Sequence, residues 1–162
     1  MVGNNGISNF GTAASESTKE LSEQISSGSG LQAKIKSRLE TAEIVKNLLE
    51  GCGMPYTADG STITVDTIRP CRMRQTIRIY SDSVVVLTSR KLQSMPTAEF
   101  INIINSKCEI GTYYTLNEEI VYSCYAFTDG QIEDKILMIL ANGKRKSMEF
   151  SFVDSARGPI YG

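Results

Sequence analysis

The sequence predicts an α+β domain, in which an antiparallel sheet carries helices mainly on one face. Amphipathic stretches with apolar residues at three- and four-residue steps occur at the start, in the middle and at the end of the folded part. Short runs rich in β-branched and aromatic residues lie between them and are joined by turn signals. The expected order of elements is therefore α-β-β-β-α-β-β-α.

The first helix is predicted to begin near Leu31. Charged residues fill most of the face opposite its apolar stripe. Gly51 and Gly53 should end it, because glycine suits the left-handed conformation that commonly closes a helix. The apolar stripe consists of Leu31, Ile35, Leu39, Ala42, Val45, Leu48 and Leu49.

Three short strands should follow as an antiparallel meander. Asp59-Gly60 is a hairpin-type turn signal, and apolar and polar residues alternate from Ser61 to Ile68. The alternation resumes from Met73 to Tyr80. A tight turn at Ser81-Asp82 then leads into the apolar run of Ser83 to Ser89.

A short helix and a second hairpin are predicted next. Pro96 suits a helix N-terminus, and the helix should end at residues 105–106. β-Branched and aromatic residues dominate residues 110–116 and 120–127, on either side of a turn at Asn117-Glu118. Four tyrosines of this hairpin are divided between the core and the surface: Tyr113, Tyr114, Tyr122 and Tyr125.

The last helix should start after Asp129-Gly130. Asn142-Gly143 could cap it, but Lys144 to Glu149 are good helix formers, so we favour a helix that continues through Phe150. The chain then divides into an arm at 1–30, an α+β domain at 31–153 and an irregular tail at 154–162. The arm is rich in Ser, Gly, Asn and Thr, which favours mobility or a helix formed only against a partner.

Composition excludes several classes of function. The formal net charge is −1, from 17 basic and 18 acidic residues, which argues against a dedicated nucleic-acid binder and against an anionic membrane surface. No run approaches the about 20 apolar residues of a membrane-spanning helix. The first ten residues lack the pattern of a signal peptide, so we expect a cytoplasmic protein.

The residue types also argue against an enzyme. The chain has no histidine, which removes the commonest catalytic base and metal ligand, and its four cysteines form no C-x-x-C pair. We expect reduced, largely buried thiols, no metal and no cofactor. A lysine-based or paired-carboxylate site stays open, although Glu118-Glu119 is better explained as a solvated turn.

The candidate binding residues are Arg72, Arg74, Arg78 and Tyr80. Their even spacing places them on one face of a strand. Arginine and tyrosine are enriched at interface hot spots, and arginines also bind phosphate. An ordinary polar outer face, with ion pairs to acids such as Asp66, explains the same pattern equally well.

One stretch of sequence resembles a known family. It contains Leu92-x-x-Met95-Pro96, then Phe100-Ile101-Asn102-Ile103-Ile104-Asn105, and ends with the two strands that reach Phe127. This stretch resembles the YbjN-like family of bacterial proteins, whose fold is similar to that of class I type III secretion chaperones. The resemblance implies protein binding and frequent dimers, and it implies no catalytic residues.

These observations predict a non-enzymatic protein-binding module, chaperone-like or regulatory, that forms a homo-oligomer. The alternative is a structural subunit of a larger assembly that docks through its termini. A third hypothesis, nucleic-acid binding through the arginine strand, requires an affinity that falls steeply with salt. The identity of the partner does not follow from the sequence.

Overall fold

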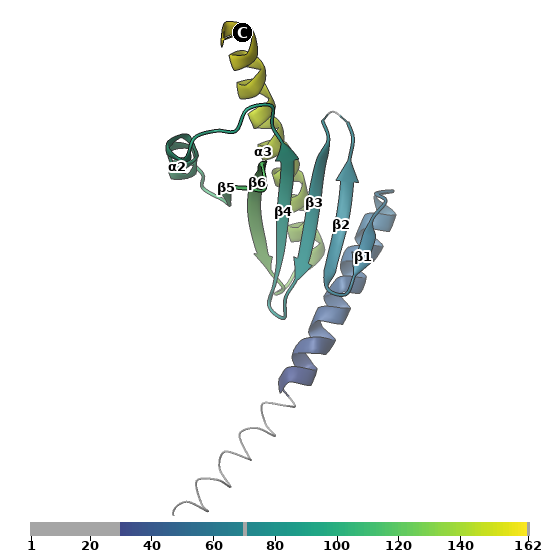
Figure 1. Ribbon diagram of the computed structural model, residues 1–162. Coiled ribbons are helices and arrows are strands. Elements are labelled where there is room, and N and C mark those ends of the chain that lie inside the picture. The colour runs from purple at the N-terminus through teal and green to yellow at the C-terminus, as the bar shows by residue number, and fades with distance from the viewer. Residues whose placement is uncertain (1–29, 70, 162) are drawn as a thin grey trace, which may run out of the picture. The chain divides into compact units, whose positions relative to one another are not determined.

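The computed structural model describes residues 30–69 and 71–161 (Figure 1). The chain forms two compact units, Met1–Ser37 and Arg38–Gly162. The described part of the first unit is helical, and it exposes Leu31 and Ile35. The predictions for the arm at 1–30 fall outside the described residues, except that Gly30 is already helical.

The second unit confirms the predicted α+β class. Its described residues form one antiparallel sheet of six strands, in the order β1-β2-β3-β4-β6-β5. The first helix ends at residue 51, α2 (Ala98–Ser106) separates β4 from β5, and α3 (Ile132–Tyr161) closes the chain. The strands are β1 (Thr57–Asp59), β2 (Thr62–Thr67), β3 (Met73–Ile79), β4 (Ser83–Lys91), β5 (Thr112–Leu116) and β6 (Glu119–Phe127).

One strand, β1, was not predicted. It has three residues, all exposed, and it pairs with β2 across the predicted Asp59-Gly60 turn. Three exposed residues show no alternation between apolar and polar positions, so only the turn signal marked this hairpin. The observed order is therefore α-β-β-β-β-α-β-β-α.

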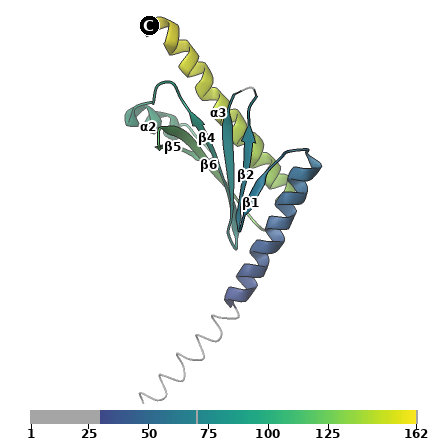
Figure 2. The ribbon, with the colours of Figure 1, turned by 45° about the vertical axis from the view of Figure 1, so that its right-hand side comes forward.

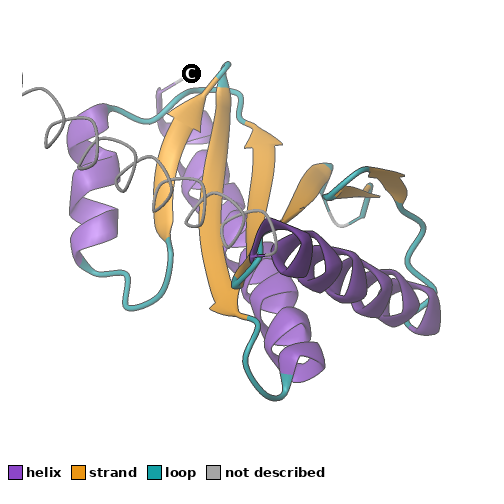
Figure 3. Cartoon of the chain, turned by 90° about the horizontal axis from the view of Figure 1, so that it is seen from below, coloured by secondary structure: helices purple, strands orange, loops and turns teal. Residues whose placement is uncertain are grey.

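The helices share one face of the sheet. Alternate residues of β2, β3, β4 and β6 point toward a core that also contains apolar residues of the first helix, α2 and α3. Figures 2 and 3 show α3 running obliquely along this face. Fully buried members of the core include Val45, Leu49, Ile63, Ile77, Val86, Tyr122, Ile136 and Ile139.

The predicted end of the first helix is confirmed. Gly53 has a φ of 64°, and its N–H donates to the Glu50 carbonyl. The N–H of Met54 reaches back to the Leu49 carbonyl at 2.9 Å. This pair of bonds satisfies the last helical carbonyls and is the Schellman arrangement that favours glycine.

The α2 helix closes one edge of the sheet. Thr97 caps it, since its hydroxyl accepts a hydrogen bond from the Phe100 N–H. At the other end, the Asn105 amide accepts from the Tyr113 N–H at 2.7 Å and donates to the Tyr113 carbonyl at 2.8 Å. These backbone groups of β5 point away from β6, so Asn105 occupies the position of a further strand.

The α3 helix continues past Asn142-Gly143, as favoured from the sequence, and extends to Tyr161. The irregular tail predicted at 154–162 is thus helical over 154–161, because no proline interrupts the chain before residue 159. No helix among the described residues combines the length and the apolar character needed to cross a membrane.

Gly143 lets α3 approach the sheet closely. A Cβ atom at this position would lie 2.3 Å from the Thr88 Oγ1 and 3.1 Å from the Gln75 Nε2. Gln75 is fully buried there and donates to the Thr88 hydroxyl and to the Leu140 carbonyl. The helix therefore crosses the strands at a buried polar contact that tolerates only glycine.

We expect Gly143→Ala to lower the free energy of unfolding by about 1–3 kcal/mol, because the added methyl overpacks this contact. Gly51→Ala is the matched control: it also lies in a helix, but a Cβ there meets nothing within 4 Å. The control should be neutral or stabilising by up to about 1 kcal/mol. Urea denaturation measures both. Thr88→Ala should partly rescue Gly143→Ala, and strictly additive effects would contradict the clash.

Asn105→Ala should lower the free energy of unfolding by about 1–3 kcal/mol, because it leaves the N–H and carbonyl of Tyr113 without their partner. Asn102→Ala, on an exposed position of the same helix, is the control and should stay within about 0.5 kcal/mol of the parent. Equal denaturation midpoints for the two variants would show that the hydrogen bonds of Asn105 to β5 do not stabilise the protein.

Candidate functional site

The face of the sheet opposite the core is not packed against any of the described helices. We call it the open face. It is polar on β2 and β3, and on β4, β5 and β6 it combines polar residues with a group of apolar ones that we call its apolar half. Its residues are Thr62, Thr64 and Asp66 on β2; Arg74, Thr76 and Arg78 on β3; Ser83, Val85, Leu87, Ser89 and Lys91 on β4; Tyr114 and Leu116 on β5; and Glu119, Val121, Ser123, Tyr125 and Phe127 on β6.

The four predicted binding residues lie on or beside the open face. Arg74 and Arg78 project from β3, Arg72 directly precedes this strand and Tyr80 directly follows it. All four are exposed. They are separated along the strand: Arg72 and Arg74 lie at its start, whereas Arg78 and Tyr80 lie at its end.

Arg74 has an acid partner and the other two arginines do not. Its Nε donates to Asp66 Oδ1 at 2.8 Å, and this hydrogen bond raises the pKa of Arg74. No carboxylate among the described residues forms an ion pair with Arg72 or Arg78. An ordinary solvated face therefore accounts for Arg74 but leaves the other two charges unexplained.

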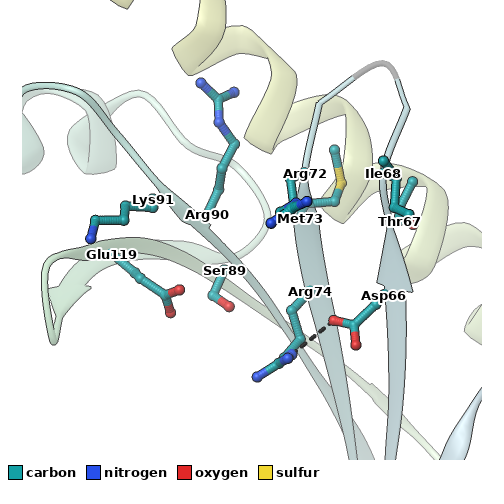
Figure 4. Close-up of a pocket in the computed structure, with 10 residues that line it drawn as sticks. All are labelled: Asp66, Thr67, Ile68, Arg72, Met73, Arg74, Ser89, Arg90, Lys91 and Glu119. Atoms are coloured by element: carbon teal, nitrogen blue, oxygen red, sulfur yellow. Dashed lines mark hydrogen bonds and ion pairs between the residues drawn. The ribbon is translucent and has the colours of Figure 1, made fainter.

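A cleft opens where β2, β3 and β4 meet the start of β6 (Figure 4). Its volume is about 430 Å³, and four basic and two acidic side chains line it. Arg90 turns toward α3, where its Nη1 donates to the Ser147 carbonyl at 3.1 Å. The remaining charged residues of the lining are Asp66, Arg72, Arg74, Lys91 and Glu119.

The apolar half of the open face was not predicted. Tyr125 and Phe127 are 60% and 55% exposed, and their rings form an edge-to-face pair with centroids 5.5 Å apart. Val85 is directly opposite Tyr125 in the register. The signal was present in the unbroken apolar run on β4, because such a run places apolar residues on both faces of a sheet.

The end of β6 is an unpaired edge. β4 pairs with β6 from Glu119 to Phe127, but β5 pairs with it only as far as Ser123. Gly111, with a φ of 79°, turns the chain away before β5 begins. The edge beyond Ser123 has no strand partner among the described residues.

Hydrogen-bond directions alternate along this edge. The N–H of Thr128 donates to the Asp82 carbonyl beside β4, so Ala126 and Cys124 also point their backbone groups toward β4. The N–H and carbonyl groups of Tyr125 and Phe127 consequently point outward. The same two residues thus offer exposed aromatic side chains and unpaired backbone groups.

An apolar pocket of about 340 Å³ lies beside this edge, on the side of α3. Burial raises the pKa of the Cys124 thiol, so the group is a neutral wall of the pocket and not a nucleophile. Its lining is Ile110, Cys124, Met138, Ile139, Ala141, Asn142 and Arg145.

The buried tyrosine hydroxyls have structural partners, whereas Gln75 Oε1 and Ser147 Oγ are buried without a hydrogen-bond partner among the described residues. Burial raises the pKa of Tyr113, which donates to the Lys146 carbonyl, and of Tyr122, which donates to the Ile110 carbonyl. Tyr113 and Tyr122 belong to the core, whereas Tyr125 is exposed, so the predicted division of the tyrosines is confirmed. All four cysteines are free thiols; Cys124 is buried, but Cys52 is exposed, contrary to the prediction of largely buried thiols. No group of residues in the described part of the chain could hold a metal ion.

The ion pair between Arg74 and Asp66 should contribute little to stability. Both side chains are about 60% exposed, and exposed pairs contribute about 0.2–1 kcal/mol. We expect a double-mutant cycle of Arg74→Gln and Asp66→Asn, measured by urea denaturation, to give a coupling energy in this range. A coupling well above it would favour a structural role for the arginine.

Comparison with solved structures supports the YbjN-like fold. The chain is similar to the crystal structure of YbjN, described as a "putative transcription regulator from E. coli", with a TM-score of 0.51 at 9% sequence identity. The match covers 64% of this chain and 83% of that chain. No family model and no curated protein matches the sequence. At 9% identity the likeness shows the fold alone, and the similarity to type III secretion chaperones stays a prediction.

Proposed function

We propose that this protein is a non-enzymatic binding module that binds an extended segment of another protein along the end of β6. One observation carries the proposal. Tyr125 and Phe127 expose their aromatic rings on the open face, and the backbone groups of the same two residues face an edge that has no strand partner among the described residues. A strand edge of this kind is a template for a further strand.

The backbone groups supply the general part of such an interaction. The N–H and carbonyl groups of Tyr125 and Phe127 offer four hydrogen bonds to an added strand. Each would contribute about 0.5–1.5 kcal/mol, which alone supports only weak binding. Side chains must therefore provide the remaining affinity and the specificity.

Side-chain sites lie on both sides of the edge. Successive residues of an added strand would point alternately to the open face and to the apolar pocket beside α3. On the open face they meet the Tyr125–Phe127 pair, and aromatic residues commonly dominate binding energy at interfaces. On the other side they meet the wall formed by Cys124 and Met138. The preferred segment has apolar side chains at alternating positions.

The predicted residues at the far end of β3 belong to the same proposal. Arg78 is paired with Val85, which is itself paired with Tyr125, so this arginine borders the apolar half. Tyr80 follows the strand at the same end. A partner that covers the aromatic pair and reaches across β4 would meet Arg78 and Tyr80, and one that extends further along β3 would meet Arg74 and Arg72.

A chaperone-like or regulatory role is in keeping with the proposal, and the proposed location is the cytoplasm. If the predicted similarity to secretion chaperones holds, the bound segment belongs to a protein held in an extended state. The description of YbjN as a transcription regulator suggests a regulatory partner instead. Self-association is also part of the proposal, because two copies could pair their β6 edges.

A second candidate is a subunit that docks through its termini. Leu31 and Ile35 lie on one face of the described part of the first unit and are 58% and 48% exposed. Isolated apolar residues at a surface are common, but two on one helical face suit a packing partner. Leu31→Ser with Ile35→Ser should reduce the size of a native assembly only if this second candidate holds.

We expect the amides of Tyr125 and Phe127 to exchange with solvent much faster than those of Cys124 and Ala126 in the isolated full-length chain. The first two amides point to the free edge, and the other two are hydrogen-bonded to β4. Hydrogen exchange followed by NMR resolves the four positions. The measurement is made at a concentration at which the chain is monomeric, because pairing of two β6 edges would also protect Tyr125 and Phe127. Equal protection of all four amides in the monomer would contradict the proposal.

A photo-cross-linking amino acid at position 125 should capture a partner in the native cells. The control is the same amino acid at position 103, since Ile103 is also exposed but lies on α2. Tyr125→Thr with Phe127→Thr should abolish binding of the captured partner while leaving the thermal midpoint near that of the parent. Capture at both positions, or at neither, would count against this surface.

A further inference from the structure

The cleft at the start of β3 has a chemistry of its own. Its lining carries four basic and two acidic side chains, although the whole chain has a net charge of −1. Positive charge is thus concentrated in one depression of a slightly acidic protein. Such a depression attracts anions more strongly than a flat surface with the same charges.

Ser89 lies on the open face between the basic residues. Arg74 is its direct partner in the register, and Lys91 is two residues further along β4. Arg72 directly precedes β3 and lines the same cleft. Ser89 has a small side chain, and Figure 4 shows Arg74 on one side of it and Glu119 on the other, with Arg72 and Lys91 at the rim of the cleft.

The guanidinium groups of Arg72 and Arg74 have donors available for a ligand. Asp66 holds Arg74 through Nε, which fixes the side chain, and among the described residues nothing is hydrogen-bonded to its two terminal nitrogens. Arg72 has no acid partner in the described part of the chain. Lys91 approaches Glu118 only to 3.9 Å, and both side chains are highly exposed, so this pair is easily replaced.

The geometry points to a binding site for a phosphate monoester, with the phosphoryl group over Ser89 and between Arg72, Arg74 and Lys91. A carboxylate is planar and is satisfied by one arginine fork. A phosphoryl group has three acceptor oxygens that need donors from several directions, and its charge of about −1.5 to −2 would be met by Arg72, Arg74 and Lys91 against the two carboxylates of the lining. The site lies at the opposite end of the open face from Phe127, so it is independent of the strand-binding edge.

The test is an NMR titration of the full-length chain at low ionic strength and pH 7.5, where the phosphate is dianionic. Inorganic phosphate should shift the amide signals of Arg72 to Arg74 and of Ser89 to Lys91, and the shifts should saturate. Adenosine monophosphate and a phosphoserine peptide are the two further arms: whichever binds more tightly than inorganic phosphate identifies the source of the group. Acetate should bind at least about tenfold more weakly, because it carries less charge and fewer acceptors.

Variants make the test specific. Arg72→Gln and Arg74→Gln should each weaken phosphate binding by about tenfold or more, the loss expected for a charged hydrogen bond. Arg78→Gln is the matched control, because it removes an exposed arginine from the same strand and face outside the cleft. It should change the affinity much less than Arg72→Gln does, because it removes only a distant charge and no hydrogen bond to the phosphoryl group. Asp66→Asn and Glu119→Gln should each tighten binding, since both remove a negative charge from the lining.

Three results would overturn the site. The first is the absence of saturable shifts with all three phosphate compounds. The second is acetate binding as tight as that of phosphate, and the third is a loss in Arg78→Gln equal to that in Arg72→Gln. None of them would bear on the β6 edge, which has its own tests in amide exchange and cross-linking.

Discussion

The position of α3 on the sheet depends on polar contacts to its backbone. Side chains from three strands donate hydrogen bonds to carbonyls in the middle of this helix: Gln75 to Leu140, Tyr113 to Lys146 and Arg90 to Ser147. Asn142 adds a bond in the other direction, to the hydroxyl of Tyr122. Apolar packing alone would allow the helix to slide or rotate, whereas these bonds fix its height and angle. Gly143 provides the close approach that makes the Gln75 contact possible.

The position of α3 determines which surfaces of the sheet are covered and which stay exposed. The helix covers the inner residues of β3, β4 and β6 but leaves an apolar pocket beside Cys124, where Gly111 has turned the chain away from the end of β6. None of the described helices covers the opposite face of the sheet. Its two halves offer different chemistry: aromatic and aliphatic residues near Phe127, and arginines around Ser89 near the start of β3.

Local patterns made most of the fold predictable. The helix stop at Gly53, the turn at Asn117-Glu118 and the alternation along β3 each depend on a few neighbouring residues. The features that escaped prediction depend on neighbours distant in sequence. The close approach of Gly143 to Thr88 joins α3 to a strand far away in sequence, and the free edge of β6 appears only when the lengths of β4 and β5 are compared.

The candidate site likewise combines features that local sequence predicted with features that it did not. Even spacing correctly placed Arg74 and Arg78 on one face, and the suggested ion pair with Asp66 is present. The apolar half of that face was missed because the run on β4 was predicted as a strand without dividing its residues between the two faces, and Val85 and Leu87 point away from the core. The cleft around Ser89 joins four strands, and no segment of sequence contains that information.

Asn105 has a consequence for how copies of this protein could assemble. By occupying the outer backbone groups of β5, it removes one of the two long edges that an endless stack of sheets would need. On the other side β1 offers only three residues. Contact through the β6 edge would then use the same patch on both molecules and close on itself as a pair, because a filament requires two different complementary edges on each subunit. If copies pair through β6 as proposed, the amide of a single asparagine limits growth to a finite particle.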